Sequence, residues 1–390
     1  MEREQIRISV RNLVEFILRS GDIDNRRASL DTMEAMQAGS RLHRKIQKKM
    51  GSTYHAEVPL NIIIEEENYE LGIWGRADGI IIEETVTIDE IKGVYLSLDL
   101  LEEPVKVHLA QAKCYAYIYG IQNDLQKINV QMTYGNLDTG DLKYFSYEYS
   151  MQQLQEWFSD LILKYKKWAD FQYEWRKKRQ ASIKELAFPF PYREGQKELA
   201  AGVYRTIARK KNLFIQAPTG VGKTISTLYP AIKAVGEGLG DKIFYLTAKT
   251  VTANVAKETL GILCEKGYRA KSVQITAKEK LCPCEEVDCN PVSCPYAKGH
   301  FDRVNDAVYD LLQKKNNMTR EVLLAHAKEY QVCPFEMCLD TATWADNIIC
   351  DYNYVFDPNV YLKRFFADGI KGDYIFLVDE AHNLVERGRE

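Results

Sequence analysis

The stretch Asn212–Thr224, with the sequence NLFIQAPTGVGKT, constrains the fold of this chain more than any other feature. We predict a buried strand at Asn212–Gln216, a tight loop of small residues, and a helix that begins at Lys223. Such a loop binds phosphate, because successive backbone N–H groups and a helix N-terminus point at the anion. The lysine reaches the β- and γ-phosphate oxygens, and the Thr224 hydroxyl group binds Mg²⁺. The sequence therefore predicts a nucleotide site, with an ordinary glycine-rich turn as the alternative.

The loop departs from the pattern G-x-x-x-x-G-K-[ST] at its first position, which is an alanine. Glycines remain where the backbone passes closest to phosphate. About twenty residues upstream, an arginine and a glutamine precede a helix and are placed to read an adenine edge, although they also fit an ordinary helix start. The predicted nucleotide-binding residues are Arg193, Gln196, Ala217, Pro218, Thr219, Gly220, Val221, Gly222, Lys223 and Thr224.

Two further apolar runs, Lys242–Leu246 and Tyr374–Val378, predict parallel strands of the same sheet. The first is followed by the segment Thr247-Ala-Lys249-Thr250 and a helix, and the second leads directly into Asp379-Glu380-Ala381-His382. An acidic residue at the carboxyl end of a parallel strand faces the ligand crevice. There Asp379 can bind Mg²⁺ through water, and Glu380 can orient and deprotonate the hydrolytic water. We assign the aspartate and His382 to the nucleotide site and Glu380 to catalysis.

The region before this domain also mixes helical and strand patterns. Helices are expected at about 10–21, 29–50 and 105–119, strands at 57–65, 69–74, 79–82 and 86–91, and a hairpin at 128–134 and 143–149. A chain of 390 residues is too long for one typical core. We predict an α/β domain at 1–150, a helical linker at 151–187 that ends at Phe188–Pro191, and a second α/β domain at 188–390.

Four residues of the first domain are candidates for one active site: His43, Asp78, Glu90 and Lys92. Period-2 spacing puts Glu90 and the lysine on the same face of a strand, whereas the aspartate is expected between two strands. Two carboxylates and an imidazole can hold a divalent cation, which polarises a phosphodiester and lowers the pKa of an attacking water. The lysine can position that water or stabilise charge. Each residue alone also fits an ordinary surface or turn role.

Together these residues resemble the PD-(D/E)xK nucleases of the RecB-like branch. The pattern covers about residues 30–120 and consists of Gly39 with His43, Gly75-Arg-Ala-Asp78, Glu90-Ile-Lys92 and Gln111-Ala-Lys-Cys-Tyr115. The resemblance implies a metal-dependent DNA nuclease in which His43, Asp78 and Glu90 bind the metal, with Glu90, Lys92, Gln111 and Tyr115 as catalytic-site residues. Some relatives carry an iron–sulfur cluster here, but this domain has only Cys114 and is not expected to.

The nine cysteines are unevenly placed, with four between Cys282 and Cys294. We see no apolar run that would span a membrane and no signal peptide, so the cytoplasm is the expected location and disulfides are not expected there. The clustering indicates metal or cluster ligation.

With the strand-end Asp-Glu-Ala-His segment and the phosphate loop, the second domain resembles the first RecA-like domain of a superfamily 2 helicase. The cysteines narrow the resemblance to iron–sulfur helicases of the XPD/DinG type, which implies a [4Fe–4S] insert at about 276–340. The implied ligands, spaced C-x₆-C-x₄-C-x₃₈-C, are Cys282, Cys289, Cys294 and Cys333. Cys284 and Cys338 are alternatives, and a four-cysteine zinc site is the other interpretation. The segment Asn347–Tyr354 resembles the strand and loop that precede the Asp-Glu-Ala-His strand, and Cys350 within it is expected to be buried.

We therefore predict an α/β protein with a nuclease-like domain followed by a RecA-like domain, and expect the chain to be the N-terminal portion of a longer helicase–nuclease. ATP, Mg²⁺ or Mn²⁺ and a [4Fe–4S] cluster are the expected cofactors. DNA, single-stranded or with a single-stranded end, is the expected partner, and the family suggests 5′ to 3′ polarity. The net charge of −3 limits any DNA surface to local patches, such as the basic residues of the linker helix. The alternatives are a DNA-guiding module without cleavage and a metabolic kinase with a zinc ribbon.

Overall fold

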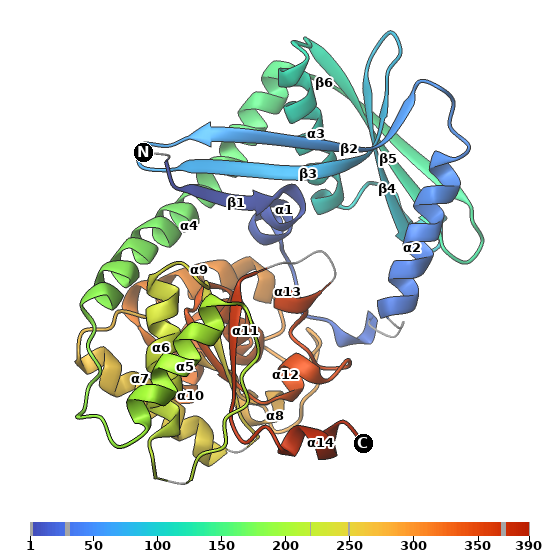
Figure 1. Ribbon diagram of the computed structural model, residues 1–390. Coiled ribbons are helices and arrows are strands. Elements are labelled where there is room, and N and C mark those ends of the chain that lie inside the picture. The colour runs from blue at the N-terminus through green and yellow to red at the C-terminus, as the bar shows by residue number, and fades with distance from the viewer. Residues whose placement is uncertain (1–2, 28–31, 219, 249, 368–371, 390) are drawn as a thin grey trace. The chain divides into compact units, whose positions relative to one another are not determined.

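The computed structural model describes residues 3–27, 32–218, 220–248, 250–367 and 372–389. It divides into two compact units, Met1–Tyr173 and Glu174–Glu390 (Figure 1). Thr219 and Lys249, together with residues 29–31 of the second predicted helix, lie outside the described residues. Within the described residues, no helix combines the length and apolar character that crossing a membrane requires.

The first unit is a mixed α/β unit in which one six-stranded sheet is accompanied by helices. Its elements are β1 (Gln5–Ser9), α1 (Val10–Leu18), η1 (Asn25–Arg27), α2 (Thr32–Gln47), β2 (Tyr54–Glu65), β3 (Glu70–Ile81), β4 (Thr87–Val94), η2 (Leu98–Leu100), α3 (Lys106–Gln122), β5 (Lys127–Asn136), β6 (Leu142–Ser150) and α4 (Met151–Glu185). The strand order is β1-β3-β4-β5-β6, and β2 also pairs with β3. The pairs β1–β3 and β4–β5 are parallel, and the others are antiparallel.

Strand β3 corrects the expectation of two strands with Asp78 between them. It is one continuous strand, and Asp78 lies inside it. Gly75 and Gly79 resemble turn signals in the sequence, but in the structure they make room for aromatic rings. A Cβ atom at Gly75 would lie 2.7 Å from the Tyr115 ring, and one at Gly79 would overlap Tyr54. Close approach of a side chain, rather than a turn, explains these glycines.

Helix α4 is a single helix of 35 residues, and the division between the two units falls within it. The sequence predicted instead a separate linker and a boundary at Phe188–Pro191. Apolar residues recur at helical spacing along its first part, including Leu154, Phe158 and Tyr165, and they are buried. This part of the helix therefore belongs to the core of the first unit.

The second unit is built around a parallel sheet. Its elements after α4 are α5 (Gln196–Ala208), α6 (Lys223–Gly236), β7 (Lys242–Leu246), α7 (Thr250–Glu265), β8 (Ser272–Gln274), α8 (Lys278–Leu281), α9 (His300–Lys314), β9 (Asn317–Met318), α10 (Arg320–Tyr330), α11 (Pro334–Trp344), β10 (Asn347–Cys350), α12 (Asn353–Phe356), α13 (Lys363–Phe366), β11 (Tyr374–Val378) and α14 (Asn383–Arg387).

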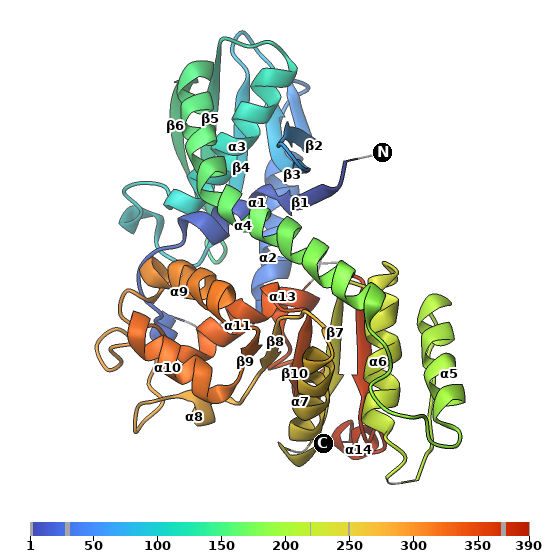
Figure 2. The ribbon, with the colours of Figure 1, turned by 90° about the vertical axis from the view of Figure 1, so that its left-hand side faces the viewer.

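The sheet order is β11-β7-β10-β8-β9, and every pair is parallel. The prediction of an α/β fold with a parallel sheet is confirmed, and the bounds of β7 and β11 agree with the predicted strands. Figure 2 shows α9, α10 and α11 gathered beside the β9 end of the sheet. These helices come from the segment between β8 and β10, where the cysteine-rich insert was expected.

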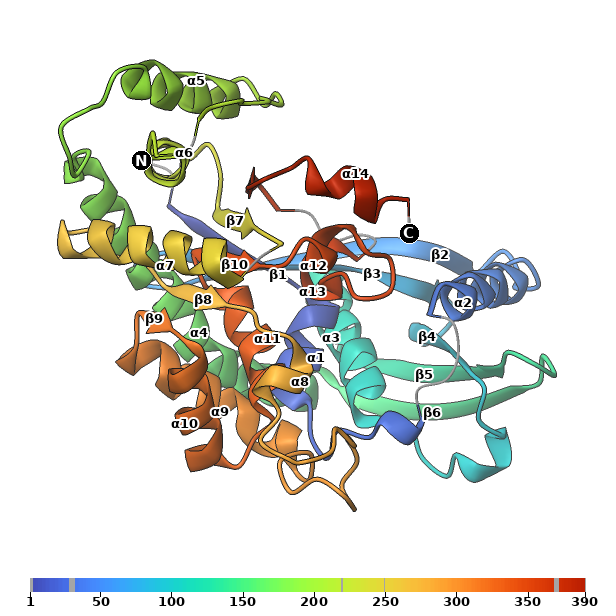
Figure 3. The same cartoon turned by 90° about the horizontal axis from the view of Figure 1, so that it is seen from below.

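The predicted strand Asn212–Gln216 is wrong. The segment forms no strand, and its apolar side chains are exposed, with Phe214 at 92%. An apolar run becomes a strand only when a neighbouring strand accepts its backbone hydrogen bonds. In the described sheet β11 is the terminal strand and pairs with β7 alone. The helix before this segment, α5, and the one after it, α6, do form and pack against each other (Figure 3).

Candidate functional site

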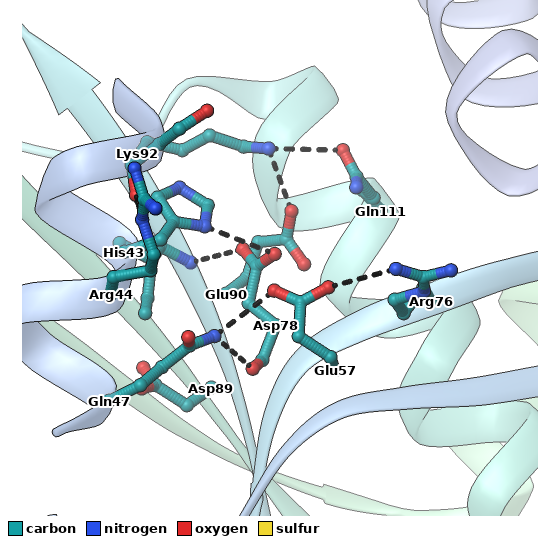
Figure 4. A network of polar contacts seen from close by, with 12 residues as sticks. His43, Arg44, Gln47, Glu57, Arg76, Asp78, Asp89, Glu90, Lys92 and Gln111 are labelled. Atoms are coloured by element: carbon teal, nitrogen blue, oxygen red, sulfur yellow. Dashed lines mark hydrogen bonds and ion pairs between the residues drawn. The ribbon is translucent and has the colours of Figure 1, made fainter. Parts of the chain in front are cut away.

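Three elements of the first unit bring a histidine and two carboxylates together: His43 from α2, Glu57 from β2 and Asp78 from β3 (Figure 4). One ligand atom from each residue lies within 4.8 Å of the other two. His43 Nδ1 is 3.5 Å from Asp78 Oδ1, and the other carboxylate oxygen of Asp78 accepts a hydrogen bond of 2.8 Å from the backbone N–H of Ile91. This bond fixes the orientation of the aspartate and leaves one of its oxygens facing the histidine.

A chain of polar contacts runs beside this group through β4 and α3. Lys92 Nζ lies 2.7 Å from Glu90 Oε1 and donates a hydrogen bond of 3.3 Å to Gln111 Oε1. Gln111 in turn donates to the hydroxyl group of Tyr115 at 3.4 Å. Glu90 and Lys92 share a face of β4, as period-2 spacing predicts. The structure therefore brings together all six residues that the sequence singled out in this domain.

The carboxyl group of Glu90 is fully buried. Burial raises its pKa to about 8, although the nearby ammonium group of Lys92 acts in the opposite direction. Its second oxygen, Oε2, has no hydrogen-bond partner among the described residues. A buried carboxyl oxygen without a donor is costly. The carboxylate and imidazole donors around it are of the types that bind Mg²⁺ and Mn²⁺, so the residues present fit a divalent cation.

The imidazole of His43 responds to the same surroundings. Burial lowers its pKa, but the hydrogen bond and negative charge of Asp78 outweigh burial, and the net pKa is raised. The hydrogen bond and the negative charge of Asp78 therefore favour the protonated form of His43. Binding of a cation to the imidazole competes with its protonation.

Glu57 belongs to this group although the sequence reasoning missed it. Its side chain reaches the other two only because the β2–β3 register puts Ala56 opposite Gly79 and Val58 opposite Ala77, which leaves Glu57 opposite Asp78. The sequence of β2 alone does not show which residues of β3 it pairs with, so it could not show that Glu57 lies opposite Asp78. The only available signal was that an acidic residue stands in a strand adjacent to the motif.

Two residues at and just before the start of α5 contact the predicted phosphate loop of the second unit. Gln196 Nε2 donates a hydrogen bond of 3.1 Å to the carbonyl oxygen of Val221, and Arg193 donates to that of Gly220. Gly222 caps α6 with φ 76°, and a Cβ atom there would lie 2.6 Å from Gln196. The left-handed conformation and the close approach both require glycine. The structure thus brings the two predicted adenine-reading residues to the loop backbone.

The acidic residues after β11 reach the beginning of α6. Lys223 Nζ donates a hydrogen bond of 3.2 Å to the carbonyl oxygen of Ala217 and lies 3.8 Å from Glu380 Oε1. The backbone N–H of Asp379 donates a hydrogen bond of 2.9 Å to the carbonyl oxygen of Leu246, and this bond holds the aspartate at the end of β7. Burial, followed by the charge of Glu380, raises the pKa of Asp379. His382 Nδ1 is 3.4 Å from Glu380 Oε2 and is mostly exposed.

A tyrosine that the sequence reasoning did not single out links the two predicted Mg²⁺ ligands of this site. The hydroxyl group of Tyr245 is hydrogen-bonded to Thr224 on α6 and to Asp379 after β11. Tyr245 pairs with Leu377 across the parallel strands, so its side chain projects to the same face as Leu377 and Asp379. The structure therefore brings Thr224 and Asp379 to one shared hydroxyl group. Their donor types fit Mg²⁺.

The cysteines fall into groups. Cys284 Sγ lies 3.9 Å from Cys294 Sγ and is also hydrogen-bonded to Cys282. Cys289 interacts with Cys333 and with the side chain of Lys278, the lysine at the start of α8. Burial raises the pKa of Cys333 to about 11. Five thiols from a short segment and the start of α11 are therefore available, and this all-thiol donor set fits an iron–sulfur cluster or zinc.

Two other cysteines lie apart from this set. Cys338 is buried inside α11, where its thiol contacts the carbonyl oxygen of Gln274 at 3.8 Å, and Cys350 is buried at the end of β10, as expected. Of the two alternative ligands that the sequence left open, Cys284 lies with the predicted ligands and Cys338 does not.

Comparison with known proteins gives matches to helicases. Residues 196–289 match the family model described as DEAD/DEAH box helicase, and residues 250–390 match the model described as DEAD_2. A probable ATP-dependent helicase of Methanocaldococcus jannaschii is 51% identical over 204 residues, which are 52% of this chain and 30% of that protein. The General transcription and DNA repair factor IIH helicase subunit XPD of Arabidopsis thaliana is 24% identical over 238 residues, which are 52% of this chain and 31% of that protein.

The Regulator of telomere elongation helicase 1 homolog of Caenorhabditis briggsae is 23% identical over 51% of this chain and 24% of its own length. The chain thus spans about a quarter to a third of the length of these relatives. Among solved structures, one titled XPD_Helicase has 20% identity and a TM-score of 0.34 over 50% of this chain and 34% of its own, which is too low to support an argument. The sequence matches show that the second unit is similar to ATP-dependent helicases of the XPD/RAD3 type.

Proposed function

We propose that this chain is part of an ATP-dependent DNA helicase acting in DNA repair or processing, and that its first unit is a metal-dependent DNA nuclease. The helicase proposal is supported by the family matches to residues 196–390. Because these matches lie outside the first unit, the nuclease proposal depends on the geometry of that unit. The observation that carries it is the convergence of His43 and Asp78, together with Glu90, which interacts electrostatically with both and is paired with Lys92.

In the nuclease site, a divalent cation would be held by the imidazole and the carboxylates, and it would polarise the scissile phosphodiester and acidify a bound water. Lys92 lies beside Glu90 and is anchored by Gln111, so that its ammonium group can stabilise the charge that develops on the phosphate. Tyr115 holds Gln111 through the next hydrogen bond of the chain. Ile91 N–H keeps the carboxylate of Asp78 turned toward His43.

In the nucleotide site, the backbone of residues 217–222 and Lys223 would bind the phosphates of ATP. Thr224 and Asp379 would hold the Mg²⁺ ion, and Glu380 would orient the attacking water. Glu380 has a left-handed backbone conformation, with φ 50°, and its carboxylate lies 3.8 Å from Lys223 Nζ. Arg193 and Gln196 would keep the loop closed around the nucleotide through their bonds to its carbonyl oxygens.

The thiols of Cys282, Cys289, Cys294 and Cys333 would bind a [4Fe–4S] cluster in the segment between β8 and β10, with Cys284 close to two of them. Thiolate ligation suits such a cluster, and it supplies no step of ATP hydrolysis. Single-stranded DNA, or duplex with a single-stranded end, is the proposed substrate of the assembled protein.

Cleavage of end-labelled single-stranded DNA with Mg²⁺ or Mn²⁺ tests the nuclease proposal. We expect the wild-type chain to cut and Glu90→Ala not to cut. The matched control is Glu84→Ala, which removes an exposed carboxylate from the turn between β3 and β4. If the wild type binds DNA but neither it nor the control cuts, the first unit instead guides DNA to the helicase.

A further inference from the structure

We infer that Glu57 is a direct ligand of the divalent cation in the first unit, so that the site has four protein ligands, His43, Glu57, Asp78 and Glu90. This inference rests on the proposed nuclease function and extends its metal site by one carboxylate.

The position of Glu57 follows from an interruption of the β2–β3 pair. Its neighbours Ala56 and Val58 pair with Gly79 and Ala77, and residues that face each other in an antiparallel pair project to the same side of the sheet. Glu57 therefore lies on the same side as Asp78. Its own φ of 57° is in the left-handed region, which a glutamate adopts only at a cost of about 1–2 kcal/mol.

The carboxylate of Glu57 is held in place from both sides. Its Oε1 atom accepts a hydrogen bond of 3.1 Å from the side-chain amide of Gln47. The same amide also donates a hydrogen bond of 3.0 Å to the carbonyl oxygen of Asp78. Its Oε2 atom accepts from Arg76 at 3.4 Å. In Figure 4 these contacts leave the carboxylate beside Asp78 and facing the same space as His43. The Glu57 side chain is still 46% exposed, but these two contacts keep its carboxylate close to the histidine and the aspartate.

An independent observation indicates that something positively charged belongs in this space. Glu90 is fully buried, and Lys92 occupies only one of its carboxyl oxygens. The other has no hydrogen-bond partner among the described residues, although it lies in the same network. Hydrogen-bond donors or a cation normally satisfy such an atom. A cation among the imidazole and the carboxylates would do so and would also screen their mutual repulsion.

Four protein ligands suit the chemistry of this cation. Mg²⁺ and Mn²⁺ prefer oxygen-rich octahedral sites, so four protein donors leave two positions for a phosphate oxygen and a water. Three carboxylates also attract a divalent cation more strongly than the two that the sequence motif supplies. We therefore expect Glu57 to contribute to affinity as much as the motif residues do.

The test measures Mn²⁺ binding to the full chain without nucleotide or DNA, by isothermal titration calorimetry and by the electron paramagnetic resonance signal of free Mn²⁺. Glu57→Gln should lower the affinity of the site by about 10- to 100-fold. Glu57→Gly should give the same loss, because glycine adopts the left-handed backbone without strain and so preserves the fold. The matched control is Glu65→Gln, an exposed glutamate at the other end of β2.

The outcomes separate this inference from the proposed function. Asp78→Asn identifies the signal that belongs to the site. If wild-type binding is lost in Asp78→Asn but unchanged in both Glu57 variants, Glu57 is not a ligand and only the present inference fails. If the wild type shows no Mn²⁺ binding that depends on Asp78, the metal site fails, and the proposed nuclease function fails with it.

Discussion

A buried aspartate before the central strand of the second unit is predicted to contribute strongly to the stability of that unit. Asp346 precedes β10, and its two carboxylate oxygens accept hydrogen bonds from three groups. Arg179 donates at 2.7 Å, the Trp175 indole at 2.8 Å and the backbone N–H of Lys271 at 2.7 Å. The Arg179 and Asp346 side chains are only 8% and 6% exposed. This cluster attaches the end of α4 to the sheet, so Arg179, one of the basic residues of the predicted linker helix, has a structural role.

The substitution Asp346→Asn keeps the size of the side chain but leaves Arg179 buried without a counter-charge. Breaking a buried ion pair in this way costs about 3–5 kcal/mol, because the remaining charge stays out of water. For a unit of this size, each kcal/mol lowers the melting temperature by about 2–4 °C. We therefore expect the transition of the second unit to fall by about 6–20 °C.

Differential scanning calorimetry of the full chain measures this shift. Asp351→Asn is the control, since Asp351 pairs with Arg387 at 2.6 Å but both side chains are about one-third exposed. Such a pair contributes less than about 1 kcal/mol. The double substitution Arg179→Met with Asp346→Asn removes both charges but keeps an amide oxygen that can accept from Trp175 and Lys271, and it should recover most of the loss. A shift for Asp346→Asn no larger than that of Asp351→Asn would refute the reasoning.

Three further predictions concern single side chains. Burial and nearby cations lower the pKa of His108 from 6.5 to about 4. As the pH falls through that range the unfolded chain binds a proton before the folded chain does, so the free energy of unfolding should decrease. In urea unfolding, His108→Gln should lose less stability over this pH range than the wild type, and an equal loss would contradict the prediction. Tyr245→Phe should weaken binding of a fluorescent ATP analogue about tenfold in the presence of Mg²⁺ and leave binding without Mg²⁺ unchanged. If the effect of Mg²⁺ on binding is the same in both proteins, Tyr245 does not position the two predicted Mg²⁺ ligands. Cys282→Ser should lower the iron content of the purified protein and Cys338→Ser should not, whereas equal losses would contradict the grouping of the thiols.

Sequence patterns were sufficient where one segment determines its own structure. The run Tyr374–Val378 is apolar throughout and ends at an acidic residue, and it forms a strand with those bounds. The period-2 spacing of Glu90 and Lys92 likewise placed both side chains on one face of β4. In both cases the strand and the direction of its side chains depend on the local period of two residues, and that period can be recognised in the sequence.

Sequence patterns were insufficient where two distant segments must meet. Glu57 approaches His43 and Asp78 through the β2–β3 register, and Tyr245 reaches Thr224 through the packing of β7 on α6. The run Asn212–Gln216 has the composition of a strand but no strand pairs with it in the described sheet. Pairing and register depend on the whole fold, which a local pattern does not contain.

The central claim is that one chain holds two separate active sites, one for ATP and one for DNA cleavage. The measurement that tests it most directly compares Asp78→Asn with Lys223→Ala in two assays, cleavage of end-labelled single-stranded DNA with Mn²⁺ and binding of a fluorescent ATP analogue. We predict that Asp78→Asn abolishes cleavage and keeps ATP binding, and that Lys223→Ala does the reverse. If cleavage survives in Asp78→Asn, or if Lys223→Ala leaves ATP binding intact, the assignment of the corresponding site is contradicted.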